Sequence, residues 1–249
     1  MMSKLRCTTR EIGSVRVFDL QGEPNQETLQ EIVWKIQRNI RRHRLQRVIL
    51  NVQKIKSLDE LGIRKLIAAF LRPRKSAIYG ASELLQHQFE DTYLPGSIKI
   101  CPTEKEVAED LGPFLLQRDE IGHVLGEKDH LDDGPRVGKE LERRRSKRMH
   151  VAIPLELTFH PSGKEAFVTR GISTNISEGG IFVEYLDLDA LEKVEALNPI
   201  EGTTLDIQIL PSSNFPESYQ LQGVVRRRDI RRGGVGLAIE FTGSFGPSN

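Results

Sequence analysis

Two short motifs in the second half of the chain decide how that half is interpreted. The first is the basic run Arg143-Arg144-Arg145-Ser146-Lys147-Arg148, and the second is Asn175-Ile176-Ser177-Glu178-Gly179-Gly180. The planar guanidinium of arginine can donate two hydrogen bonds to a phosphate or to the edge of a guanine, and it can stack on a base. The basic run is therefore a candidate phosphate site, and the glycines of the second motif favour a tight turn.

The sequence around these motifs predicts a small all-β barrel. Apolar runs of strand length are separated by turn residues. The predicted strands are residues 151–159, 166–173, 181–185, 203–210, 219–227 and 235–241. A second basic run at 226–232 precedes Gly233-Gly234, which indicates a strand end and a hairpin turn. A supporting ligand contact from Arg226 or Arg228 is the less favoured alternative.

The first 116 residues alternate between strand and helix patterns in the order β-β-α-β-α-β-α-β-α. Apolar residues recur at helical spacing between 29 and 40, and the nearly continuous apolar run at 48–52 is typical of a central strand. Ser57 with Glu60, and Thr103 with Glu106, have the spacing of capping boxes that open further helices. We therefore predict an α/β module at 1–116, a linker at 117–142, where charged residues, Gly and Pro accumulate, and a β-barrel module at 143–249.

The two motifs together resemble the ligand site of a PilZ domain. In that family an Arg-x-x-x-Arg pair and an Asp/Asn-x-Ser-x-x-Gly motif bind cyclic diguanylate (cyclic di-GMP). Here Arg144 and Arg148 match the first, and Asn175, Ser177 and Gly180 match the second. The resemblance also implies a ligand contact from Arg143, whose place before the pair is compatible with binding of a stacked dimer of the dinucleotide.

Each motif alone has a simpler interpretation. A charge run is usually a solvated stretch at a domain edge, and the second motif alone would be a polar turn between strands. Their joint occurrence within a strand-rich region favours the PilZ interpretation over both.

The first module resembles, between about residues 5 and 114, the STAS fold of anti-sigma-factor antagonists. Phosphorylatable members carry Asp-Ser-Ser-Gly before the second helix, whereas this chain has Asp59-Glu60-Leu61-Gly62. Both serines are absent, so the resemblance implies a protein-binding module without a kinase switch at this turn. Glu60 has two interpretations, a partner of Ser57 in a capping box, which is favoured, or a weak imitation of a phosphoserine.

The composition excludes several classes of protein. Hydrophobic residues make up 38% of the chain, and the net charge of +1 argues against a generic nucleic-acid-binding protein. The histidines and the two cysteines, Cys7 and Cys101, have no metal or redox spacing, so we expect no metal site and reduced, packed thiols. No catalytic motif, signal peptide or membrane-spanning run is present, which favours a cytoplasmic protein that is not an enzyme and has no cofactor.

These observations predict a bacterial signalling adaptor. Its PilZ domain would bind cyclic di-GMP, and its STAS-like domain would engage a protein partner. The alternative is an interaction scaffold that binds no nucleotide and whose arginines contact an acidic protein.

Overall fold

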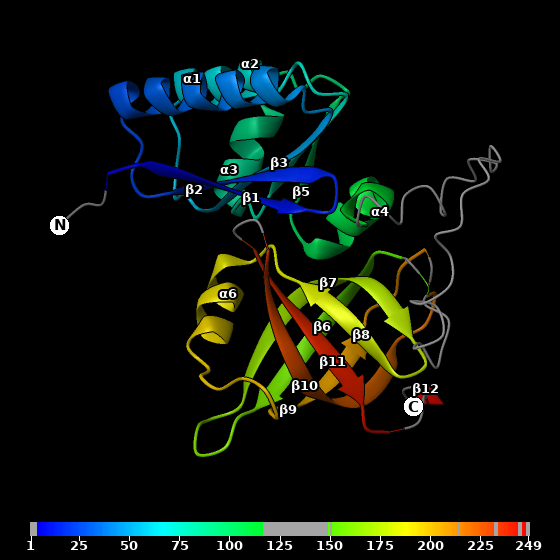
Figure 1. The fold of residues 1–249 in the computed structure, drawn as a ribbon. Coiled ribbons are helices and arrows are strands. Elements are labelled where there is room, and N and C mark those ends of the chain that lie inside the picture. Colours follow the sequence, from blue (N-terminus) through cyan, green and yellow to red (C-terminus); the bar gives the residue numbers. More distant parts are fainter. Residues whose placement is uncertain are drawn as a thin grey trace, which may run out of the picture.

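The chain folds into two modules (Figure 1). The computed structural model describes residues 4–116, 149, 151–213, 215–231, 234–243 and 246–247. The first module is a sheet covered by helices, and the second is a β-barrel, so the two-part architecture agrees with the predicted fold class. The predicted linker at 117–142 lies outside the described residues.

The sheet of the first module has five strands that lie in their order along the chain. They are β1 (Arg6–Ile12), β2 (Val15–Gln21), β3 (Arg47–Lys54), β4 (Lys75–Tyr79) and β5 (Ile98–Cys101). β1 and β2 form an antiparallel hairpin, and β2 to β5 are parallel. The predicted central strand is β3, whose residues from Val48 to Val52 are all buried.

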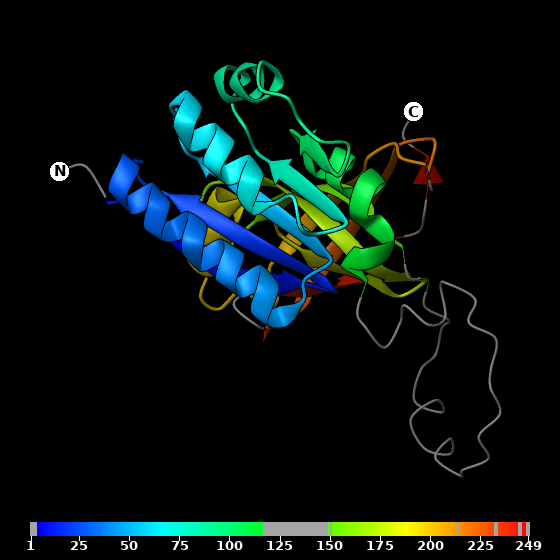
Figure 2. The ribbon, with the colours of Figure 1, turned by 90° about the horizontal axis from the view of Figure 1, so that it is seen from above.

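Three helices cover one face of this sheet: α1 (Gln26–His43), α2 (Glu60–Ala69) and α3 (Glu83–Glu90) (Figure 2). Right-handed crossovers between sequentially ordered parallel strands place every connecting helix on the same side. α4 (Glu104–Leu115) follows the last strand and packs against the opposite face. The order of elements agrees with the one predicted.

The side chains of the strands divide between two cores because successive residues of a strand point to opposite faces. In β2, Phe18 and Leu20 join the core beneath α1 to α3, whereas Val15 and Val17 join the core that contains α4. Residues of the barrel module also belong to the core that contains α4.

The helix starts test the predicted caps. The capping box of Thr103 with Glu106 is confirmed at α4, and α1 opens with another, formed by Asn25 and Thr28. The predicted cap at Ser57 is wrong, because Asp59 is the N-cap of α2 and its carboxylate accepts a hydrogen bond from the Gly62 amide at 2.7 Å. Two candidate capping side chains lie two residues apart, and the helix begins after the second.

The two cysteines are free thiols. Cys101 is buried and Cys7 is partly buried, and burial raises the pKa of each thiol to about 12. Both stay protonated at neutral pH and pack as small apolar groups, as predicted.

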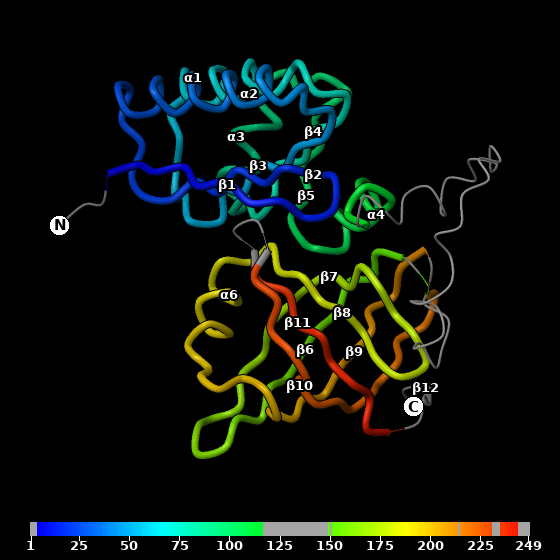
Figure 3. The backbone as a smooth tube through the Cα atoms, in the orientation of Figure 1, coloured from blue at the N-terminus to red at the C-terminus, as the bar shows by residue number. Residues whose placement is uncertain are grey.

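Six strands close the barrel of the second module. They are β6 (Ile153–His160), β7 (Phe167–Ser177), β8 (Gly180–Glu184), β9 (Thr204–Ile209), β10 (Tyr219–Arg231) and β11 (Gly234–Phe241). They neighbour one another in the order β11-β8-β7-β6-β9-β10, and β10 pairs back onto β11 (Figure 3). The short β12 (Gly246–Pro247) adds to β10. All six predicted strands are present, and the hairpin predicted after residue 226 joins β10 to β11.

The sequence did not predict the helix α6 (Leu188–Glu195), which lies beside the barrel between β8 and β9 (Figure 1). Asp187 caps it, and Leu188, Leu191 and Val194 pack into the barrel core. Its apolar stripe spans only two turns, which is too short to identify a helix by periodicity.

The barrel and α4 cover the face of the first sheet that α1 to α3 leave free. One continuous core contains Ile49 of β3, Leu111 of α4, and Ala152, Ile172 and Leu186 of the second module. Parallel sheets are found almost only with both faces covered. The second module therefore takes the place that further helices would occupy in a domain folded alone.

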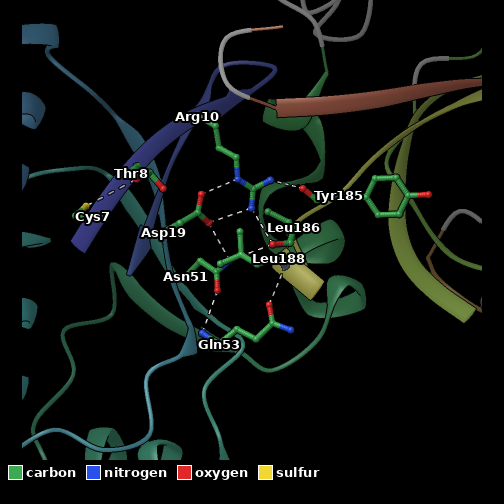
Figure 4. A network of polar contacts seen from close by, with 9 residues as sticks. All are labelled: Cys7, Thr8, Arg10, Asp19, Asn51, Gln53, Tyr185, Leu186 and Leu188. Carbon is green, nitrogen blue, oxygen red and sulfur yellow. Dashed lines mark hydrogen bonds and ion pairs between the residues drawn. The ribbon is translucent and has the colours of Figure 1, made fainter. Parts of the chain in front are cut away.

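A buried polar network also crosses this boundary (Figure 4). Arg10 of β1 and Asp19 of β2 form an ion pair with both side chains 3% exposed, and the Arg10 Nε donates to Asp19 at 2.7 Å. The same guanidinium donates to the backbone carbonyls of Tyr185 and Leu186, which follow β8. Every polar group of this ion pair thus has a hydrogen-bond partner. Two of these partners, the carbonyls of Tyr185 and Leu186, belong to the barrel module.

Amide side chains of β3 extend the network toward α6. Asn51 donates to Asp19 Oδ1 at 2.9 Å and to the carbonyl of Leu186 at 3.0 Å. Gln53 donates to Asp187 at 2.7 Å and accepts from the Leu188 amide at 3.0 Å. These directional contacts fix how the two modules are oriented.

Candidate functional site

The second motif lies where β7 meets β8. Asn175 and Ser177 are the last partly exposed residues of β7, Glu178 and Gly179 form the turn, and Gly180 begins β8. The Ser177 hydroxyl donates to the Gly180 carbonyl at 3.3 Å. The expectation that Asn175 and Ser177 belong to the turn itself is wrong, because the strand ladder continues to Ser177.

A β-bulge precedes Asn175. The pairing of β7 with β8 shifts between Ser173 and Asn175, and the Ser173 hydroxyl accepts from the Asn175 amide at 3.3 Å. Bulges change the direction of nearby side chains and are frequent beside binding sites. The side-chain amide of Asn175 makes no hydrogen bond to another described residue.

The residue that directly follows the basic run pairs with this hairpin. Met149 and Ile176 form a bridge in which the Met149 amide donates to Ile176 at 2.7 Å and the Ile176 amide donates back at 3.0 Å. Ile176 lies between Asn175 and Ser177, and Met149 immediately follows Arg148 in the sequence. Arg143, Arg144 and Arg148 themselves lie outside the described residues.

Glu240 and Arg226 border the motif; the sequence analysis offered Arg226 as a less favoured ligand contact and did not single out Glu240. Glu240 of β11 pairs with Gly180, and its carboxylate forms an ion pair with Arg226 of β10. Sequence analysis favoured a hairpin role for the run that contains Arg226, and that hairpin is present. Only the closure of the barrel shows that Arg226 lies one strand away from β8.

Gly180 is held closely against β11. A Cβ atom at this position would lie 2.3 Å from the carbonyl oxygen of Ile239, which is backbone and cannot move aside independently. Gly179, the neighbouring residue in the turn, has open space around the equivalent position. Packing alone therefore requires a glycine at this position of the motif.

Replacing Gly180 with valine should destabilise the barrel and abolish the dinucleotide binding that the resemblance of the motif implies. The added side chain must separate β8 from β11, and overpacking of this kind costs about 1–3 kcal/mol. Thermal unfolding and calorimetric titration measure the two effects. The matched Gly179→Val variant should change both much less, and equal losses in the two variants would contradict the packing explanation.

The described residues contain no group of three or more side chains able to hold a metal ion. Among the described helices, none combines the length and apolar character needed to cross a bilayer.

Comparison with known proteins identifies the second module. Residues 142–244 match the family model of the PilZ domain, so this part of the chain is a PilZ domain. None of the curated proteins compared with the chain matches it. The described part of the matched region contains the complete Asn-x-Ser-x-x-Gly motif.

Solved structures with similarity to the chain include three proteins. The inhibitor of motility MotI/DgrA of Bacillus subtilis is 25% identical, with 47% of this chain and 54% of that chain covered and a TM-score of 0.32. The PilZ domain of YcgR from Escherichia coli, with c-di-GMP, is 15% identical, with coverages of 40% and 78% and a TM-score of 0.26. PlzA of Borreliella burgdorferi, in complex with c-di-GMP, is 15% identical, with coverages of 42% and 46% and a TM-score of 0.25. The similarity to MotI/DgrA thus spans about half of that protein.

Proposed function

We propose that this protein is a signalling adaptor whose PilZ domain binds cyclic di-GMP and whose N-terminal α/β module engages a protein partner. The observation that carries the proposal is the Met149–Ile176 bridge, which attaches the arginine-bearing segment to the strand that holds Asn175 and Ser177. Met149, which directly follows Arg148 in the sequence, is therefore joined by backbone hydrogen bonds to the residue between Asn175 and Ser177.

The ligand matches the chemistry of this arrangement. Cyclic di-GMP carries two phosphates and two guanines, and Arg144 and Arg148 would grip phosphate and the O6/N7 edge of guanine while Asn175 and Ser177 bind the second base. Each charge-assisted hydrogen bond contributes about 1.5–3 kcal/mol. Three or four of them supply much of the roughly 8 kcal/mol of a micromolar complex, before ordering costs are subtracted. Arg143 would extend the site to a second, stacked ligand molecule.

The output of the adaptor would pass through β8. This strand begins at Gly180 in the proposed site and ends at Glu184, directly before Tyr185 and Leu186, whose carbonyls accept hydrogen bonds from Arg10 of the other module. If the ligand has different affinities for two placements of β8, its binding would change how often the contact between Arg10 and the two carbonyls forms. Ligand contacts with residues 143–148 would act on the preceding linker as well.

We assign the N-terminal module to a STAS-like interaction role without catalysis. Its sheet order, and a second helix that starts after Asp59, agree with that fold. Glu60 is exposed and forms an ion pair with Arg64 one turn later, so it does not act as a cap partner of Ser57. The second interpretation of Glu60, a weak imitation of a phosphoserine, stays a prediction.

Calorimetric titration of the purified chain with cyclic di-GMP tests the proposal. Saturable heat in the micromolar range is expected, at physiological salt. Absence of heat at high micromolar ligand would contradict the proposal and favour the alternative, an interaction scaffold that binds no nucleotide. Steeply salt-dependent binding of generic RNA or DNA would instead favour a nucleic-acid-binding protein. A pull-down with and without the dinucleotide then identifies the partner of the first module.

Replacing Asn175 and Ser177 together with alanine should weaken cyclic di-GMP binding by about tenfold or more, since two neutral hydrogen bonds contribute about 0.5–1.5 kcal/mol each. Stability should change little, because Asn175 makes no side-chain hydrogen bond to a described residue and Ser177 makes a single long one, to the Gly180 carbonyl at 3.3 Å. The control is Glu178→Ala, which alters an exposed position of the same turn outside the motif. Unchanged affinity in the double variant would place the base site elsewhere.

A further inference from the structure

The outer face of α1 carries an exposed tryptophan between an acidic and a basic half. Trp34 is 67% exposed and lies opposite the buried stripe of the helix. Glu27 and Glu31 precede it, and Arg38, Arg41 and Arg42 follow it, on the part of the helix that is not buried. The indole and the last turns of the helix line a shallow depression. Figure 2 shows α1 and α2 side by side on the face away from the barrel.

Local effects do not account for this surface. The helix macrodipole favours acidic residues at the start of a helix and basic residues at its end. It does not favour a large exposed indole halfway along. Glu27, Glu31, Arg38 and Arg41 also form no ion pair with another described residue. Leu61 in α2 and Leu71 just after it are further exposed apolar side chains of the first module, at 47% and 52% exposure.

The spacing of the charges is symmetric about the tryptophan. Glu27 lies seven residues before Trp34 and Arg41 lies seven residues after it. When two copies of the helix pack antiparallel about a twofold axis through Trp34, Glu27 of each copy faces Arg41 of the other. Glu31 then faces Gln37 of the second copy, one residue from Arg38, and the two indoles meet at the centre.

We propose that α1 is the contact surface of a twofold-symmetric homodimer, with Trp34 at the axis and Glu27–Arg41 ion pairs on both sides. A closed twofold contact uses the same patch on each subunit and requires that patch to be complementary to itself. Paired aromatic rings and flanking arginines add favourable stacking and cation–π contacts. The surface meets these requirements within a single helix.

The charge pattern selects a second copy over other occupants. An acidic protein or an anionic membrane would attract the arginines but would be repelled by Glu27 and Glu31 on the same stripe. Only a partner that presents basic groups to the first half and acidic groups to the second half matches both. One helix pair of about 27 Å in length is a small interface, so dissociation in the micromolar range is expected.

Charge reversal tests the pairing directly. The Glu27→Arg variant places two basic side chains opposite each other at both ends of the contact, and Arg41→Glu places two acidic ones there, so each variant alone should be monomeric. In the mixed dimer one copy is basic at both positions and the other is acidic at both, so each end again pairs unlike charges and mixing the two variants should restore the dimer. Sedimentation equilibrium of the full chain without ligand measures each mass. The control, Glu83→Arg, reverses an exposed first-turn glutamate of α3 and should leave the dimer intact.

Trp34 is the only tryptophan of the chain, so its fluorescence reports on this surface alone. Between low and high micromolar protein, its emission should shift to shorter wavelength and its quenching by acrylamide should fall. A wild-type chain that stays monomeric at high micromolar concentration would overturn the proposal. A dimer that survives both reversals, or a mixture of variants that stays monomeric, would overturn it equally.

Discussion

Replacing Arg10 with alanine is expected to lower the free energy of unfolding of the full chain by about 3–5 kcal/mol. The substitution leaves the Asp19 carboxylate, 3% exposed, without its cation, and it removes donors from the carbonyls of Tyr185 and Leu186. For a protein of this size the loss corresponds to a fall in melting temperature of about 6–20 °C. Calorimetric or circular-dichroism melting measures it.

Two matched variants separate the buried ion pair from an ordinary surface pair. Arg64→Ala removes a cation whose side chain is 66% exposed and should cost only about 0.3–0.5 kcal/mol. Arg10→Met with Asp19→Leu removes both buried charges and should be much milder than Arg10→Ala alone, because the unpaired charge causes most of the loss. A melting temperature of Arg10→Ala within about 1 °C of wild type would refute the structural role of the network.

Replacing Arg144 and Arg148 together with alanine is expected to weaken cyclic di-GMP binding by about a hundredfold or more, and either replacement alone by at least tenfold. The loss follows from the charge-assisted hydrogen bonds, at about 1.5–3 kcal/mol each. The melting temperature of the free protein should be nearly unchanged. Lysine at either position should be a poor substitute, because it keeps the charge but lacks the fork that binds phosphate or guanine with two hydrogen bonds.

The basic run supplies its own control for this experiment. Arg145→Ala with Lys147→Ala removes the same number of charges from the same segment but leaves the motif intact. If general electrostatic attraction held the ligand, the two double variants would lose affinity equally. Calorimetric titration of both double variants distinguishes general electrostatic attraction from specific hydrogen bonds. Equal losses of affinity would refute the assigned roles of Arg144 and Arg148.

The local sequence predicted most elements of the fold because their signals lie within a few residues. The alternation of strands and helices up to residue 116 followed from apolar periodicity, and the barrel strands followed from short apolar runs between turns. Asn175, Ser177 and Gly180 were likewise predicted as a group, and the structure places them at the end of one hairpin. The contacts of Arg143, Arg144 and Arg148 remain predictions.

Where two local signals competed, the sequence was insufficient. Ser57 and Asp59 are both good caps, and the path of the chain after β3 selected Asp59. Asn175 looked like a turn residue, yet pairing with β8 extended β7 through a bulge to Ser177. The energies that separate such alternatives come from neighbouring strands, which local patterns do not contain.

Local patterns along the chain predict two modules, their classes of structure and the motif that marks the proposed ligand site. They do not predict that the barrel covers the open face of the first sheet, that Arg10 binds carbonyls 175 and 176 residues away, or that Trp34 is exposed on α1. The physical reason is the range of the interactions. Helix and strand periods, caps and turns depend on neighbours in the chain, whereas burial, ion pairing and docking depend on which surfaces meet after the chain has folded.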